Sequence, residues 1–438
     1  MAVNESAGSN REFGGLEITP FHFAGFAFLA LGLGLGIYQG IQHLGVVSDA
    51  GWIGWSHIHF VTVGAFTQLI FGMLPQLTAR KVNQPGPAKP TTWGLFIALN
   101  GGFILAWIGR GWGYFRVYDT GVLLVLLAVV GLFLLVLKSV AQGERSLVRD
   151  ATVGLYLVAP VVFLYGLVLA FGLYSHGNLF DVPGGWWGLR EAHVHANAWG
   201  FLGLIAIGTL YDVFPKLVNT SLYSRRMKGY SFWFFVIGIG PLAVGPALGM
   251  GRTITATGLV FFAIGYLMFF INLMMTFQSG SSSGLSWSVL LAQIWILGPA
   301  GFAPFILFGV PIGIPERSIE AGALHFFFMG WALPIALAGL AIYFRNLPPA
   351  GKSTDEIKKR RQILPKQRVP GSVIRPEMVL LWNVGVLLAG ISLFYQDQTW
   401  SVYALATGFG VLILIWLYYM LQIGWIRWHS LLRTPSHG

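Results

Sequence analysis

The stretch "REAHVHANAWGFLGLIAIGTLYDVFPKL", residues 190–217, decides the fold. It is an apolar run long enough to cross a lipid bilayer, for which about 20 residues are needed. Two histidines, His193 and His195, lie near its start. An imidazole in so apolar a run is costly unless it is hydrogen-bonded or bound to a ligand. The stretch therefore predicts a transmembrane helix whose histidines have a specific partner.

The rest of the chain shares this apolar character. Of its 438 residues, 55% are hydrophobic and 10% are charged, whereas a soluble domain carries roughly 25% charged residues. We therefore expect an all-α, polytopic membrane protein with twelve transmembrane helices in a single domain, residues 1–438. The expected spans are 20–41, 53–75, 92–110, 118–138, 151–174, 192–215, 230–249, 253–276, 285–309, 318–344, 377–395 and 400–424.

The basic residues are distributed unevenly between the two sides of the predicted bundle. The chain has 27 lysines and arginines and a net charge of +11. Five arginines lie on one side, so 27 − 5 = 22 basic residues lie on the other. By the positive-inside rule, both termini and the basic loop 345–376 are cytoplasmic, and the bilayer rather than nucleic acid is the expected partner. The five outer arginines are Arg110, Arg116, Arg190, Arg252 and Arg317.

An internal repeat relates the second, sixth and tenth spans. They contain "SHIHFVTVGAFTQLIFG" (56–72), "AHVHANAWGFLGLIAIG" (192–208) and "GALHFFFMGWALPIALA" (322–338). The three copies lie four spans apart, which predicts three four-helix units of approximately 20–138, 151–276 and 285–424. Aligned, they give a first site (His57, His193, Ala323), a second site (His59, His195, His325) and a glycine five residues later (Gly64, Gly200, Gly330).

The spacing of the histidines indicates what they hold. Residues i and i+2 of a helix point about 200° apart, so the two histidines of one helix face different pockets. Five of the ten histidines occupy the two repeated positions, which favours metal or haem ligation over isolated hydrogen bonds or proton relay. We expect the repeated glycines to open room beside the helix for a planar group such as a porphyrin. The absence of cysteine excludes thiolate ligands and covalently attached c-type haem.

These features resemble subunit I of the haem-copper oxidase superfamily, which has twelve helices in three units. The motif "HVHANAWGFLGLIAIGTLYDVFPKL" (193–217) is similar to the tenth helix of C-family oxidases and nitric oxide reductases, although here it lies on the sixth span. The histidine-plus-glycine helices also resemble the NnrS family of haem- and copper-containing membrane proteins linked to nitric oxide. The resemblance implies b-type haem near the outer face, copper as an option, an electron donor, partner subunits, and a prokaryotic plasma membrane.

The chain departs from the family at the active site. The seventh span, "SFWFFVIGIGPLAVGPALG" (231–249), lacks the histidine pair that helps to hold copper in the oxidases. Ala323 stands where the family has the first histidine of the tenth helix. The resemblance therefore implies a relative without the full binuclear oxygen-reducing centre.

The resemblance, extended by the repeat, implies two bis-histidine b-type haems. It pairs His57 with His325 and His59 with His193. His195 then faces a third pocket, where Ala323 supplies no partner, and which is vacant, holds a five-coordinate haem or keeps copper. A competing pairing joins His59 and His325 around one haem.

Charged residues near the span ends complete the candidate sites. Haem propionates need partners, and arginine binds carboxylates through two parallel hydrogen bonds. The candidates are Arg110, Arg116, Arg190 and Arg252. At the inner end of the sixth span, Asp212 and Lys216 are expected to form a local ion pair.

Three functions fit the sequence. The first is a haem oxidoreductase that transfers electrons or reacts with a small gas such as nitric oxide. The second is a non-catalytic haem sensor, carrier or subunit. The third is a transporter whose histidines relay protons or bind a metal in transit.

Overall fold

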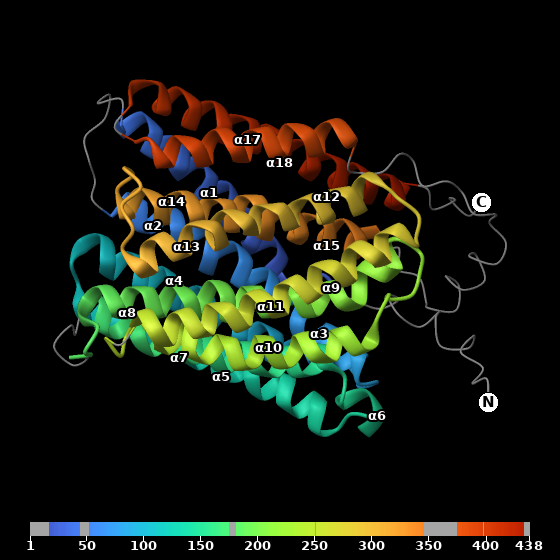
Figure 1. Cartoon of the computed structure of the whole chain (residues 1–438). Coiled ribbons are helices and arrows are strands. Elements are labelled where there is room, and N and C mark those ends of the chain that lie inside the picture. Colours follow the sequence, from blue (N-terminus) through green and yellow to red (C-terminus); the bar gives the residue numbers. More distant parts are fainter. Residues whose placement is uncertain are drawn as a thin grey trace.

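The computed structural model describes residues 17–43, 52–174, 181–249, 251–345, 375–396 and 398–432. Within these ranges it has helices and no strands, and twelve helices are long and apolar enough to cross a membrane. The expected all-α polytopic fold is confirmed (Figure 1), and the protein is an integral membrane protein. The expected basic loop 345–376 lies, apart from its ends, outside the described residues.

Eight of the twelve spans are single α-helices, and the short α6 (Arg145–Val148) connects two of them. The eight are α1 (Pro20–His43), α4 (Lys89–Trp112), α5 (Phe115–Ala141), α7 (Ala151–Tyr174), α10 (Arg225–Val244), α11 (Gly251–Gln278), α17 (Pro376–Phe394) and α18 (Thr399–Leu432). The ninth span combines α12 (Gly284–Ala292), the 3₁₀ turn η4 (Gln293–Ile296) and α13 (Leu297–Phe308).

The second, sixth and tenth spans have a composite structure that the sequence did not predict. Each starts as an α-helix, widens into a π-helix and returns to an α-helix. The π-helix starts at, or one residue after, the second-site position of the predicted repeat. Such segments are rare and occur frequently at functional sites. The elements are α2 (Ile53–His59), η2 (Phe60–Thr67) and α3 (Gln68–Lys81); α8 (Gly185–Val194), η3 (His195–Gly203) and α9 (Leu204–Leu217); and α14 (Glu316–His325), η5 (Phe326–Ala332) and α15 (Leu333–Arg345).

These three composite spans form the centre of the bundle. In each of them 72% of the most apolar window is buried, against 22–56% in the other nine spans. Because successive spans alternate in direction, all three start at the same end of the bundle. Figure 1 shows α2, α8 and α14 at this end, which we call the histidine end, and α3, α9 and α15 at the other.

The same neighbours recur around the centre. The pairs α4–α5, α10–α11 and α17–α18 each pack tightly as hairpins. Between them, α5 packs on α7, α11 packs on α12 and α13, and α18 packs on α1, which closes the ring. Each hairpin brings two glycines together, so the backbones approach closely. The pairs are Gly102 with Gly121, Gly238 with Gly258, and Gly385 with Gly408.

The repeated glycines of the central spans do not open room for a cofactor, so that expectation was wrong. A Cβ atom on Gly64 would lie 2.7 Å from the Cβ of Phe28 on α1. A Cβ atom on Gly200 or Gly330 would likewise collide with a side chain of α7 or η4. Each glycine therefore lets its central span pack against the first helix of the same predicted unit.

We predict that Gly102→Ala destabilises the protein by about 1–3 kcal/mol, because overpacking against a rigid neighbour costs that much. The added Cβ would lie 2.7 Å from the Gly121 carbonyl oxygen and 2.8 Å from the Val125 backbone nitrogen, which cannot move aside independently. The matched control is Gly101→Ala, whose Cβ would meet nothing within 4 Å. Thermal unfolding in detergent measures the effect, and equal melting temperatures for the two variants would contradict it.

Candidate functional site

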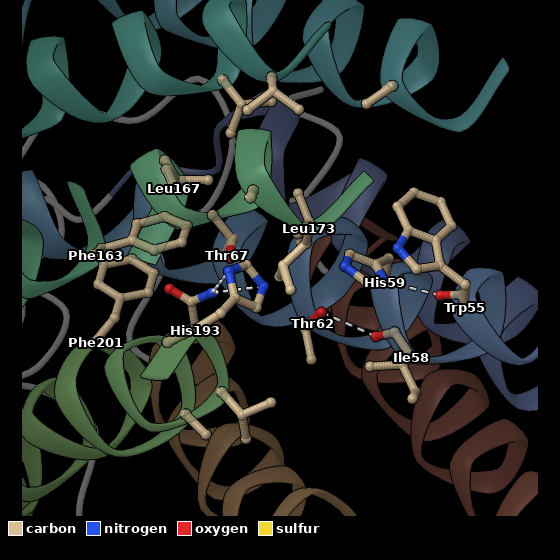
Figure 2. Close-up of a pocket in the computed structure, with 18 of the residues that line it drawn as sticks. Trp55, Ile58, His59, Thr62, Thr67, Phe163, Leu167, Leu173, His193 and Phe201 are labelled. Carbon is tan, nitrogen blue, oxygen red and sulfur yellow. Dashed lines mark hydrogen bonds between the residues drawn. The ribbon is translucent and has the colours of Figure 1, made fainter. Parts of the chain in front are cut away.

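Three cavities lie between the central spans at the histidine end. The α2–α8 cavity has a volume of about 360 Å³ and is lined by His59 from α2 and His193 from α8. Figure 2 shows the two imidazole rings on opposite sides of this cavity. They lie close enough to interact electrostatically. The structure thus brings together two histidines that are 134 residues apart (193 − 59).

The α2–α14 cavity has a volume of about 240 Å³ and is lined by His57 and His325. These two histidines also interact electrostatically. The ring of Phe409 on α18 packs edge-on against both, with centroid distances of 5.6 Å to each. The structure does not bring His59 and His325 to a common cavity, as the competing pairing would require.

The α8–α14 cavity is the largest of the three, with a volume of about 700 Å³. It is lined by His195 and by Ala323, which occupies the position of a second histidine. Its outer wall comes from α11 and α13. The two histidines of α2 therefore face two different cavities, and so do the two histidines of the sixth span.

The residue between the two repeated positions forms the partition between cavities. Ile58 lines both cavities that border α2, and Val194 lines both cavities that border α8. Leu324 lines all three. The H-x-H pattern thus supplies two imidazoles that point apart and one apolar wall between them.

The first-site histidines are held by backbone carbonyls of the neighbouring helix. His57 Nδ1 lies 2.7 Å from the Gly32 carbonyl oxygen on α1, and His193 Nδ1 lies 2.8 Å from the Gly166 carbonyl oxygen on α7. A carbonyl oxygen can only accept, so Nδ1 carries the proton and Nε2 keeps its lone pair. Such a bond fixes the ring orientation of metal-ligating histidines.

Glycines on the first helix of each of the first two predicted units make these contacts possible. A Cβ atom on Gly32 would lie 2.7 Å from Val61 Cγ2, and one on Gly166 would collide with Asn197. The role of both glycines was not predicted from the sequence, because they lie 25 and 27 residues before the histidines that they contact. The sequence pattern that could have revealed them is a glycine at a similar distance before the first-site histidine in two of the units.

The second-site histidines differ from one another. His59 Nδ1 donates to the carbonyl oxygen of Trp55, one turn earlier, at 2.8 Å, and its ring stacks on the indole of Trp55 (Figure 2). His325 interacts with the backbone of Val386 on α17, and its buried Nε2 has no hydrogen-bond partner among the described residues. The Nδ1 of His195 is also buried, and no described residue forms a hydrogen bond with it.

An amide lies against the ring of His193. Asn197 Nδ2 is 3.1 Å from His193 Nε2, where it donates to the lone pair. Its own Oδ1 is buried and finds no partner within the described ranges. A metal bonded to His193 Nε2 would therefore displace this amide. The displacement is easy because no described residue forms a hydrogen bond to the amide oxygen.

The four candidate arginines have different positions. Arg110 lines the α2–α8 cavity, where its guanidinium lies 4.2 Å from the centre of the Tyr174 ring. Arg190 lines both the α2–α8 and α8–α14 cavities, and Arg252 lines the latter. Arg116 is exposed and lines none of the three.

Among the residues that the structure describes, acidic side chains line one of the three cavities. Arg190 bridges Glu320, at 2.7 Å, and Glu191, at 3.5 Å, and both carboxylates line the α8–α14 cavity together with Glu316. The described residues that line the α2–α8 and α2–α14 cavities include no aspartate or glutamate. The three cavities thus share a geometry but differ in charge.

The donor atoms come in pairs. Among the described residues, no group of three or more histidine, cysteine, aspartate or glutamate side chains is placed to hold a metal ion. Two imidazoles that face each other across a cavity match the two axial positions of a haem iron. The set fits haem better than a copper ion held by protein side chains alone, so the copper expectation stays an untested prediction.

The comparison with known protein families adds no identification. No family model matches the chain. The chemistry of the site is therefore inferred from its own residues.

At the opposite end of the bundle, four charged side chains form a network. Asp212 pairs with Lys81 at 2.9 Å and with Lys228 at 3.2 Å, rather than serving only the local pair expected with Lys216. Asp150 pairs with the same two lysines, at 3.3 and 2.6 Å. The network joins α3, α9 and α10 to the start of α7, which fixes the central spans at the end farthest from the cavities.

We predict that Asp150→Asn lowers the stability at neutral pH by about 2 kcal/mol. Burial raises the pKa of Asp150, but Lys228 and Lys81 outweigh it and hold the pKa at about 2, below its ordinary 3.8. A lowered carboxyl pKa contributes stability above the unfolded value, and this contribution disappears as the pH falls through the folded value. The difference in melting temperature from the native protein should therefore be full above about pH 4 and vanish towards pH 2.

The matched control is Asp181→Asn, which alters an exposed carboxylate outside the network. Thermal unfolding across this pH range makes the comparison. A pH-independent difference for Asp150→Asn would contradict the assignment of the stability to this charge.

Proposed function

We propose that this protein is a membrane haem protein for electron transfer that binds two b-type haems. His59 and His193 ligate one haem, and His57 and His325 ligate the other. The positive-inside rule puts both haems towards the outer face of the membrane. The proposal takes up the pairing that the repeat and the haem-copper oxidase resemblance implied.

One observation carries the proposal. Two cavities each receive one histidine from each of two central helices. Three of these four histidines donate Nδ1–H to a backbone carbonyl, so Nε2 carries the lone pair, which in His193 accepts a hydrogen bond from Asn197 Nδ2. The fourth, His325, has its Nε2 buried without a partner among the described residues. An apolar interior tolerates such nitrogens when a ligand satisfies them.

The charged side chains at the α2–α8 cavity also support the binding of haem. Haem carries two propionates, and the α2–α8 cavity is bordered by Arg110 and Arg190, with no acidic side chain among its described lining residues. Arginine can bind a propionate through two parallel hydrogen bonds. In the α2–α14 cavity the polar side chains besides the histidines are the amides Gln39 and Gln396, which can donate to a propionate.

The number of histidines proposed for each haem indicates which reaction the haem would support. A haem with two axial histidines supplies one-electron transfer, and it leaves no open iron position for a gas. Ile58, Leu324 and Phe328 each line both cavities, so one layer of side chains lies between the two haem sites. This arrangement supports electron relay between them and gives no support for nitric oxide reduction at either site.

We predict that the purified protein is coloured and contains two b-type haems per chain by pyridine haemochrome. Its reduced spectrum should be of the low-spin type and should not shift with carbon monoxide, because both axial positions are filled. A colourless protein would favour a transporter instead. A spectrum that shifts with carbon monoxide would show an open iron position and favour a gas-binding sensor or oxidoreductase.

Histidine variants should group by cavity. We predict that His59→Ala and His193→Ala each remove the same haem, and that the double variant loses no more than either single one. His57→Ala and His325→Ala should remove the other haem. The measurement is haem content per chain together with the optical spectrum of protein that elutes as a single species.

The control is His22→Gln, which changes a buried histidine that lines none of the three cavities. It should keep both haems. If His59→Ala and His325→Ala proved to remove one and the same haem, the competing pairing would replace the one proposed.

A further inference from the structure

We propose that the α8–α14 cavity binds a lipid-soluble quinol, which donates its electrons to the haem between His59 and His193. The inference rests on the proposed function for the electron acceptor. The binding site itself rests on the shape, charge and polar groups of a cavity in which His195 is the one histidine among the described lining residues.

The cavity extends from the histidine end to the middle of the bundle. Arg252, at its outer mouth, and Leu267, at its deep end, both lie on α11. They are 267 − 252 = 15 residues apart, which is about 22 Å along a helix. Since a bilayer core is about 30 Å thick, the deep end reaches well into the hydrocarbon region.

The deep end opens sideways between α11 and the ninth span. Leu267, Ile294 and Leu297 line the cavity, yet 56%, 51% and 67% of their surfaces are exposed. In a membrane-spanning bundle, exposed leucine and isoleucine at this depth face lipid. A molecule dissolved in the bilayer can therefore enter here, with its tail between α11 and α13.

The charge of the lining disfavours a third haem. Glu191, Glu316 and Glu320 outnumber Arg190 and Arg252, and Arg190 is already paired with two of these carboxylates. A porphyrin with two propionates would meet uncompensated negative charge in a partly apolar site, which is costly. The cavity therefore suits a neutral ligand.

Aromatic and polar side chains define the head-group end. The indole of Trp199 lies against Phe327 and Phe262, with centroid distances of 4.6 and 5.7 Å, and all three line the cavity. They provide flat apolar walls for a planar ring. His195 lines the same space, and its buried Nδ1 has no partner in the described ranges. A quinol hydroxyl or a quinone carbonyl would satisfy this imidazole by a hydrogen bond.

Electron transfer then follows from the partition between cavities. Val194 and Leu324 line both the α8–α14 and the α2–α8 cavity. One quinol loses two electrons and two protons and becomes a quinone. The electrons reduce the two ferric haems, one each, by way of the site between His59 and His193. The protons leave to water at the mouth near Arg252 and Glu316, and the quinone returns to the bilayer.

The experiment uses the full-length protein in phospholipid nanodiscs with decylubiquinone and decylubiquinol as probes. Calorimetric titration with the quinone should show one saturable site, and the quinol should reduce the haems. Leu259→Trp fills the cavity from α11. It should weaken quinone binding at least tenfold and slow reduction by quinol in proportion, while reduction by dithionite stays unchanged.

The matched control is Val260→Trp on the adjacent residue of α11, which is 57% exposed and does not line the cavity. It should bind the quinone as the native protein does. His195→Phe keeps a ring but loses the hydrogen bond, so it should weaken binding about fivefold or more and keep both haems.

Several results would overturn the inference without touching the proposed function. They are the absence of saturable quinone binding to a protein that carries haem, equal binding by Leu259→Trp and Val260→Trp, and a third haem that His195→Phe removes. If the protein carries no haem, the proposed function fails. The binding titration with its two tryptophan variants then still decides whether the cavity is a quinone site.

Discussion

Two histidines separated by one residue on a helix cannot face the same side, and the arrangement of the whole site depends on this constraint. Each central helix that carries the pair must border two cavities, so the histidines of α2 and of the sixth span point to different neighbours. Two such helices and the tenth span, which keeps only His325 of the pair, surround one centre and border three cavities. The residue between the histidines, Ile58 or Val194, becomes the wall between adjacent cavities.

The packing around the centre serves this arrangement. Glycine at positions 64, 200 and 330 lets each central span lie directly against the first helix of its predicted unit. That close approach brings the carbonyl oxygens of Gly32 and Gly166 within hydrogen-bonding distance of His57 and His193. The widened π-helical turns follow directly after the histidines. Packing and ligand orientation thus depend on the same small residues.

Much of the fold could be predicted from the sequence, because a bilayer demands long apolar helices and leaves a strong signal. All twelve expected spans match helices, with ends that differ by a few residues. The periodicity of one helix also sufficed to predict that His57 and His59 face different pockets. Those properties depend only on residues close together in the chain.

The rest depended on contacts between distant segments. The repeated glycines were read as room for a cofactor, but only the neighbouring helix shows that Phe28 fills the space beside Gly64. The charge of Asp212 had an obvious local partner in Lys216, yet Lys81 lies 131 residues away in the chain and binds it. Among the outer arginines, Arg116 has the same local signature as Arg110 but lies on an exposed surface.

The third cavity shows how a repeat can give rise to different chemistry. Ala323 stands where the other two units have His57 and His193, but the loss of one imidazole alone would leave an incomplete copy of the other two sites. Here the change coincides with the three carboxylates of Glu191, Glu316 and Glu320 and with a lipid-facing opening at Leu297. Among the described residues that line the two cavities with paired histidines, none carries a carboxylate. The two proposals account for these differences together, because a neutral, membrane-soluble ligand and an anionic cofactor place opposite demands on the charge of a lining.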